Sequence, residues 1–154
     1  MSNLDLLKKL IKIESISPND NGCFDVIKKQ FEGLDFSFEE TNYKNISNLV
    51  ITNGNSKNKT FCFLGHTDVV PPGPESEWTV PPFSGEIIDN KIYGRGAADM
   101  KGGVACFISA LKEFLSEYKD PSFNIMVLLN SNEEGKLENG KVDRVINEMI
   151  DKDK

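Results

Sequence analysis

Two strand-like segments separated by a long helix-like segment constrain the fold more than any other feature of this sequence. The run 124–129 is almost continuously apolar, which is typical of a strand covered on both faces. The segment 60–64 is rich in strand-forming residues, and residues 100–118 carry apolar side chains at helical spacing. This order predicts a parallel strand-helix-strand unit with a right-handed crossover, and therefore an α/β fold.

The rest of the sequence predicts shorter elements around this unit. Apolar periodicity predicts helices over 3–13, 23–34 and 142–150, with Leu34 on the apolar face of the second. Strands are predicted at 36–39 and 48–52, and a hairpin at 85–93 with its turn at Asp89 and Asn90. The proline-rich stretch 70–83 is predicted to be a long surface loop, a kind of segment that is often functional.

The charge of the chain excludes several classes of partner. With 24 acidic and 18 basic residues the net charge is −6, and arginine occurs only at Arg95 and Arg144. A nucleic-acid surface needs a basic stripe, so we expect no nucleic-acid partner. Apolar runs far shorter than about 20 residues predict no membrane span. The first residues lack the pattern of a secretory leader, so we expect a cytoplasmic protein.

Histidine and cysteine usage limits the possible metal sites. His66 is the only histidine, which excludes sites that need two imidazoles from these residues. The cysteines Cys23, Cys62 and Cys106 are far apart and form no C-x-x-C pair. We interpret them as small buried apolar residues rather than as a disulfide framework or a thiolate site.

Three polar clusters follow or precede the segments of the predicted unit. His66 and Asp68 follow the strand at 60–64, Asp99 precedes the long helix, and Glu133 and Glu134 follow the strand at 124–129. Ligands of open α/β sheets bind beyond the carboxyl ends of the strands, so parallel strands would bring the clusters together. One imidazole with several carboxylates is a nitrogen and oxygen ligand set suited to a divalent metal.

Each residue of these clusters also has a simpler interpretation. His66 alone could be a structural residue, although Asp68 is placed to orient its ring. Asp99 could be the N-cap of the helix that follows. Glu133 and Glu134 could be a solvated acidic pair. It is the convergence of all these residues that favours a metal site.

The segment 94–99 resembles the glycine-rich turn of a nucleotide-binding site, but Asp99 stands where the third glycine would be. A carboxylate there would repel a pyrophosphate at the helix N-terminus, so we reject nucleotide binding. Gly94 and Gly96 are expected to give the backbone freedom for a sharp turn that delivers Asp99.

Four motifs resemble, in order and spacing, the dizinc amidohydrolases that include acetylornithine deacetylase, aminoacylase and carboxypeptidases. They are GHTDVVP at 65–71, WTVPPFSG at 78–85, YGRGAADMKG at 93–102 and SNEEG at 131–135. Within this family, these motifs, the segment 15–20 and Cys23 are most similar to the desuccinylases that act on N-succinyl-LL-2,6-diaminopimelate. The resemblance implies hydrolysis of that compound to succinate and LL-2,6-diaminopimelate, in lysine and diaminopimelate biosynthesis.

The resemblance also implies a role for each residue of the clusters. His66 would ligate one zinc ion, Asp99 would bridge two, and Glu134 would ligate the other. Glu133 would be the general acid and base, and Asp68 would hold the His66 ring. The cofactors would be two Zn²⁺ ions, with Co²⁺ as a substitute. The substrate would be a small N-acyl amino acid, and the complete protein would be a homodimer.

Family members are longer than this chain, and they continue with another carboxylate ligand, a lid or dimerisation domain and a late histidine ligand. The resemblance therefore implies that residues 1–154 are the amino-terminal part of a catalytic domain with a mixed sheet flanked by helices, without the lid domain and inactive alone. Two alternatives stay open. One is a deacylase of another N-acyl amino acid such as acetylornithine, and the other is a non-catalytic metal-binding or interaction fragment.

Overall fold

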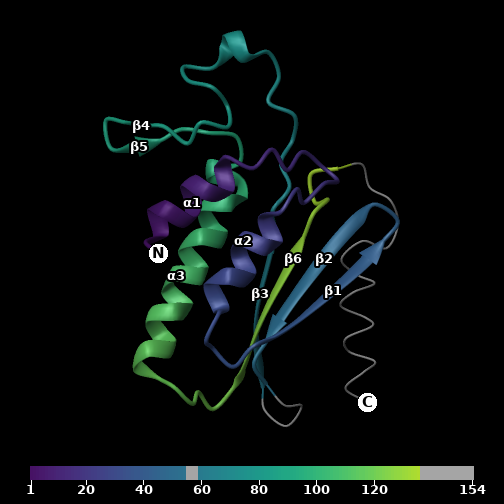
Figure 1. Cartoon of the computed structure of the whole chain (residues 1–154), viewed down its shortest axis with the longest axis vertical. Helices are drawn as coiled ribbons and strands as arrows, with labels where there is room; N and C mark the ends of the chain where they lie inside the picture. Colours follow the sequence, from purple (N-terminus) through teal and green to yellow (C-terminus); the bar gives the residue numbers. More distant parts are fainter. Residues whose placement is uncertain (55–58, 136–154) are drawn as a thin grey trace.

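The computed structural model describes residues 1–54 and 59–135 of the chain. The strands are β1 (Ser37–Tyr43), β2 (Ile46–Thr52), β3 (Thr60–His66), β4 (Ile87–Ile88), β5 (Lys91–Ile92) and β6 (Asn124–Asn130). The α-helices are α1 (Asn3–Ile11), α2 (Cys23–Lys28) and α3 (Gly102–Glu117), with 3-10 helices at Lys29–Phe31 and Glu75–Glu77. Four strands form a mixed sheet in the order β1-β2-β6-β3, and β4 and β5 form a separate hairpin (Figure 1). The predicted α/β class is confirmed.

The predicted strand-helix-strand unit is present as β3, α3 and β6. β3 and β6 are parallel, and their register runs from Thr60 opposite Asn124 to His66 opposite Asn130. The two strands therefore end side by side, at the same edge of the sheet. This register brings the polar residues after β3 next to the polar residues after β6.

The other half of the sheet is antiparallel. β1 pairs with β2, and β2 pairs with β6. β1 lies at the edge and is mostly exposed, which explains why its residues Glu40, Thr41 and Asn42 are polar. The strand predicted at 36–39 is consequently too short, because an exposed edge strand needs no apolar alternation.

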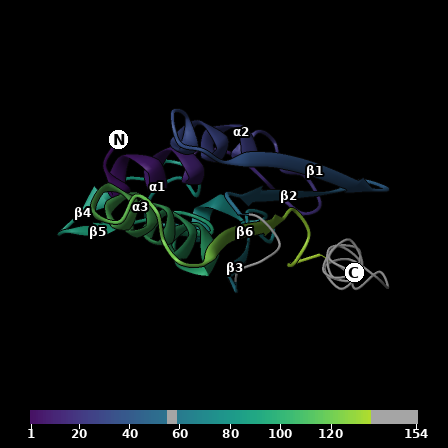
Figure 2. The ribbon, with the colours of Figure 1, turned by 90° about the horizontal axis from the view of Figure 1, so that it is seen from below.

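The helices α1, α2 and α3 pack on one face of the sheet and share one core with it (Figures 1 and 2). The residues of β6 that face the helices alternate along the strand as Ile125, Val127 and Leu129, each at most 1% exposed. The helices contribute Leu6, Leu10, Cys23, Phe24, Ile27, Val104, Ala105, Ile108 and Leu111. The apolar periodicity of the sequence therefore identifies the core correctly.

The second helix ends earlier than predicted. α2 ends at Lys28 and continues as a 3-10 helix to Phe31, after which Glu32 leaves the helical conformation and Gly33 has a φ of +80°. Leu34 lies beyond this break and is 37% exposed, so its predicted place on the buried face is wrong. The helix predicted at 142–150 lies outside the described residues.

The proline-rich loop between β3 and β4 is held to the segment that leads to Asp99. The Trp78 indole donates from Nε1 to the carbonyl of Pro72 at 3.0 Å, and the Arg95 guanidinium lies 5.1 Å from the centre of its ring. The Arg95 amide donates to the carbonyl of Pro82 at 2.7 Å. Both a side-chain contact and a backbone hydrogen bond therefore attach the loop to the glycine-rich turn.

The interpretation of the cysteines is correct for one of three. Cys23 is buried in the core, whereas Cys62 and Cys106 are exposed. Cys62 lies on β3 between Phe61 and Phe63, which stack on Phe107 of α3, so its side chain takes the opposite face of the strand. All three thiols are free, and no helix in the described part of the chain has the length and apolar character to cross a membrane.

Candidate metal centre

Three segments that are distant in the sequence converge at the carboxyl ends of β3 and β6. His66 is the last residue of β3, Asp99 lies in the turn Ala97–Lys101 before α3, and Glu133 and Glu134 follow β6. The Thr67 amide donates to the carbonyl of Asn130 at 2.9 Å, so the pairing of the two strands continues into the site. The predicted convergence is therefore present.

The His66 side chain is buried and makes polar contacts through both ring nitrogens. Nδ1 lies 3.0 Å from the backbone oxygen of Asp68 and 3.5 Å from its carboxylate. Nε2 lies 3.1 Å from the Asp99 carboxylate and 3.9 Å from that of Glu133. Burial alone would lower the pKa of His66, but the contacts with Asp68 and Asp99 outweigh it and raise the pKa to about 9.

Asp68 joins the His66 segment to the loop after β6. Its buried carboxylate accepts hydrogen bonds from the amides of Glu133 and Glu134, each at 3.1 Å, and from the Ser17 hydroxyl. Burial would raise the pKa of Asp68, but these hydrogen bonds and the one with His66 lower it below its ordinary value. Asp68 is thus held as a carboxylate that can fix three segments at once.

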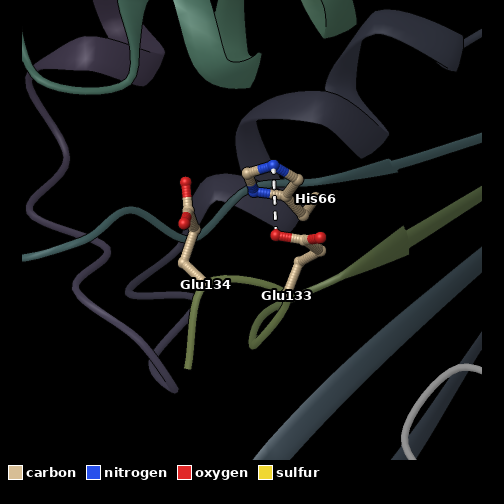
Figure 3. Close-up of side chains that lie close together, drawn as sticks. All are labelled: His66, Glu133 and Glu134. Atoms are coloured by element: carbon tan, nitrogen blue, oxygen red, sulfur yellow. Dashed lines mark ion pairs between the residues drawn. The ribbon is translucent and has the colours of Figure 1, made fainter. Parts of the chain in front are cut away.

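The two glutamates approach the His66 ring from different directions (Figure 3). One ligand atom from each of His66, Glu133 and Glu134 lies within 4.8 Å of the other two. The Glu133 side chain is 59% exposed. Burial raises the pKa of Glu134, and the neighbouring Asp99 carboxylate raises it further. Repelling carboxylates around one imidazole are the arrangement that a bound cation would stabilise.

Asp99 contacts this cluster through His66 and is not a helix cap. α3 has Lys101 as its N-cap residue, without a side-chain cap, and Asp99 has the extended backbone angles φ −124° and ψ 105°. The N-cap interpretation is therefore wrong, because the turn places Asp99 before the helix and directs it to His66. The prediction of backbone freedom is confirmed for Gly96, which has a φ of +76°. Gly94 has no positive φ and serves a different purpose, because a Cβ there would lie 2.4 Å from Ile11.

A cavity of about 310 Å³ opens at the cluster. Its lining includes His66, Asp99 and Glu133, together with the apolar Leu64 and Met100. A larger cavity of about 440 Å³ lies between the chain that follows α2 and the end of α3, but its lining contains none of the residues of the cluster. One imidazole nitrogen with carboxylate oxygens is a donor set that fits Zn²⁺, so the residues present suit the metal that the resemblance implies.

Comparison with known proteins identifies the family. Residues 62–154 match the model of peptidase family M20/M25/M40. The chain belongs to this family. The matched range contains every residue of the cluster, from His66 to Glu134, whereas Ser17 lies outside it.

Several curated relatives of this M20 chain carry the same name. The chain is 46% identical over 154 residues to the succinyl-diaminopimelate desuccinylase of Psychromonas ingrahamii. This match covers 96% of this chain and 40% of that protein. The chain is also 46% identical over 140 residues to the desuccinylase of Rhodospirillum centenum, with 88% and 36% covered. The chain therefore spans about 40% of the length of these relatives.

Solved structures of M20 proteins confirm the fold. The metallo-carboxypeptidase Sso-CP2 from Sulfolobus solfataricus superposes with a TM-score of 0.80 at 26% identity, over 100% of this chain and 36% of that one. Human carnosine dipeptidase 1 superposes with a TM-score of 0.75 at 27% identity, over 86% of this chain and 32% of that one. The architecture described above is thus a portion of an M20 catalytic fold.

Proposed function

We propose that this chain carries the amino-terminal part of the catalytic domain of a metal-dependent desuccinylase. The reaction would be hydrolysis of N-succinyl-LL-2,6-diaminopimelate to succinate and LL-2,6-diaminopimelate. The observation that carries the proposal is the approach of ligand atoms from His66, Glu133 and Glu134 to within 4.8 Å of one another, with Asp99 3.1 Å from His66. The shared name of the curated relatives supports the choice of substrate.

We assign the metal ligands to His66, Asp99 and Glu134. These residues would hold two Zn²⁺ ions, which Asp99 would share, and Co²⁺ would substitute for Zn²⁺. Bound there, the metal would polarise the amide carbonyl and lower the pKa of a bound water. Asp68 would keep His66 in the orientation that presents Nε2, because it contacts the ring at Nδ1.

Glu133 is the proposed general base and acid. Its exposed carboxylate lines the cavity beside His66, where it can take a proton from the attacking water and later donate one to the leaving amine. Asp68 would hold both the proposed base Glu133 and the proposed ligand Glu134 in place, since it accepts hydrogen bonds from the backbone amides of both residues.

The expected partner is a small N-acyl amino acid, and the longer protein is proposed to be a cytoplasmic homodimer. Because the chain spans about 40% of the curated relatives, we propose that turnover also needs groups from the part that it does not match. A second candidate is cleavage of a peptide, which the dipeptidase and carboxypeptidase structures favour, and deacylation of another N-acyl amino acid such as acetylornithine also stays open. A third candidate is that the chain is a non-catalytic fragment that binds a metal.

A chimera tests the proposal. Residues 1–154 would replace the matching segment of the Psychromonas ingrahamii desuccinylase, and release of succinate, acetate or amino acid would be measured on N-succinyl-diaminopimelate, N-acetylornithine and a dipeptide. We expect succinate release that falls by roughly 100-fold or more in Glu133→Gln with zinc content unchanged. The matched control is the exposed Glu117→Gln on α3, which should keep full activity. Full activity of the Glu133 variant, or preference for another substrate, would contradict the proposal.

A further inference from the structure

Lys101 is a buried lysine two residues after the proposed ligand Asp99. It has no exposed surface, and its Nζ donates to the carbonyls of Leu10 and Ile13 at 2.8 Å each. These carbonyls lie at and just beyond the carboxyl end of α1, where the helix dipole favours a positive charge. A buried ammonium is costly unless it is paired. The ammonium therefore joins the turn before α3 to the end of α1.

The Asp99 carboxylate has little else to hold it. Its side chain is 77% exposed, and within residues 1–54 and 59–135 the hydrogen bond of its carboxylate is the one to the His66 ring. A side chain with so few contacts takes its position from the backbone that carries it. The position of the proposed bridging ligand is thus set by the conformation of the turn Ala97–Lys101.

That turn is folded tightly around Lys101. The Lys101 amide donates to the carbonyl of Gly96 at 2.9 Å. A Cβ on Gly96 would lie 2.4 Å from Val69 and 3.4 Å from Cδ of Lys101, and a Cβ on Gly102 would lie 2.3 Å from the carbonyl of Ala97. The lysine stem therefore packs inside the turn while its ammonium fastens the turn to α1.

The chain that follows α1 also holds the other half of the site. The Ser15 hydroxyl donates to the carbonyl of Thr67 at 2.7 Å, and the Val69 amide donates to the carbonyl of Ser15 at 2.9 Å. Ser17 donates to Asp68. Residues 10–17 are therefore a common support, attached to the His66–Asp68 segment by hydroxyl and backbone groups and to the Asp99 turn by Lys101.

We propose that Lys101 is a positioning residue of the metal centre, which sets the distance between Asp99 and His66 by fastening the Asp99 turn to α1. This inference rests on the proposed metal site. It predicts that Lys101 acts on metal binding through the position of Asp99, although the hydrogen bonds of its ammonium go to Leu10 and Ile13 and not to Asp99.

A double-mutant cycle on the 154-residue chain tests this inference. Zinc affinity would be measured by competition with a chromophoric chelator for the wild type, Lys101→Met, Asp99→Asn and the double variant. We expect Lys101→Met to weaken zinc binding by about 10-fold or more in the wild type and by less than about 2-fold when Asp99 is already replaced. An equal loss in both backgrounds, or no loss, would overturn the inference.

Amide hydrogen exchange gives a second readout that needs no metal. In Lys101→Met the amides of residues 97–103 should exchange at least about 10-fold faster, while those of β6 keep their protection. If the wild type binds no zinc, the proposed function fails, and unchanged exchange of this turn would separately overturn the role of Lys101.

The stability control is Ile108→Val in the core of α3, which should leave zinc affinity unchanged. If Lys101→Met does not fold, Lys101→Gln takes its place, and failure of both assigns Lys101 to folding alone and overturns the inference.

Discussion

At the scale of single residues, His66 is enclosed by carboxylates at both ring nitrogens. Asp68 faces Nδ1, while Asp99 and Glu133 face Nε2. Without a metal this environment favours the imidazolium form, which is why the pKa of His66 rises to about 9. These carboxylates would bind a metal cation together with His66. Without the metal, they stabilise the protonated form of the His66 ring instead.

This pKa predicts how stability depends on pH. The folded-state pKa lies above the ordinary value of 6.5, so the stabilising contribution is complete below about pH 6.5 and is lost as the pH rises through about 9. In chelator-treated protein, we expect the free energy of unfolding to fall by an amount on the order of 1 to 3 kcal/mol across this window. Urea denaturation at a series of pH values measures it. His66→Gln should remove most of the fall, and an identical pH profile in that variant would contradict the assignment.

Single residues also show what sequence reasoning can and cannot find. The convergence of His66, Asp99, Glu133 and Glu134 was predictable because each lies next to the end of a predicted element, and parallel strands bring such ends together. The hydrogen bonds from the amides of Glu133 and Glu134 to Asp68 join residues about 65 positions apart, so no local pattern announces them. Lys101 was missed because lysine is almost never fully buried without a partner, and its partners are backbone carbonyls that have no signature in the sequence.

At the scale of elements, Asp20 connects the start of α2 to the site. Its carboxylate accepts hydrogen bonds from the amides of Gly22 and Phe24 and from the Thr67 hydroxyl, all at 3.0 to 3.1 Å. It therefore supplies the cap that Gly22, the N-cap residue of α2, cannot provide.

We expect Asp20→Ala to destabilise the protein by about 1 to 3 kcal/mol, because a short helix loses its cap and Thr67 loses its acceptor. The midpoint of urea unfolding, followed by circular dichroism, measures the change. Asp35→Ala, at an exposed position after the 3-10 helix, is the matched control and should change stability by less than about 0.5 kcal/mol. Equal effects of the two substitutions would show that the Asp20 contacts contribute nothing specific.

The boundaries of an element were predictable from the sequence where burial imposes a periodic apolar pattern. They were not predictable for exposed elements, which lack such a pattern. β6 and α3 are both in the core, and their predicted ranges agree with the structure to within about two residues. β1 and the 3-10 helix after α2 lie at the margin of the fold, where polar residues and a left-handed glycine override periodicity. The turn Ala97–Lys101 also had no periodic signal, because its conformation depends on contacts with α1 and Val69.

At the scale of the whole molecule, the proposed ligands come from the end of β3, the turn before α3 and the loop after β6. A metal bound by all three would cross-link segments that separate on unfolding. We therefore expect zinc to stabilise the folded chain, by about 2.7 kcal/mol when its free concentration is 100 times the dissociation constant. Thermal unfolding with zinc and with chelator measures the shift. His66→Gln should abolish the stabilisation, and the same shift in that variant would place the metal elsewhere.

The chain contains a single tryptophan, Trp78, which lies in the proline-rich loop under the Arg95 guanidinium. All indole fluorescence of these 154 residues therefore originates from this loop, and the sheet and the helices contribute no indole emission. Because Arg95 also leads into the turn that carries Asp99, the emission of Trp78 is an intrinsic optical probe of the loop beside the site. It can be recorded without any label and separately from the circular dichroism of the fold.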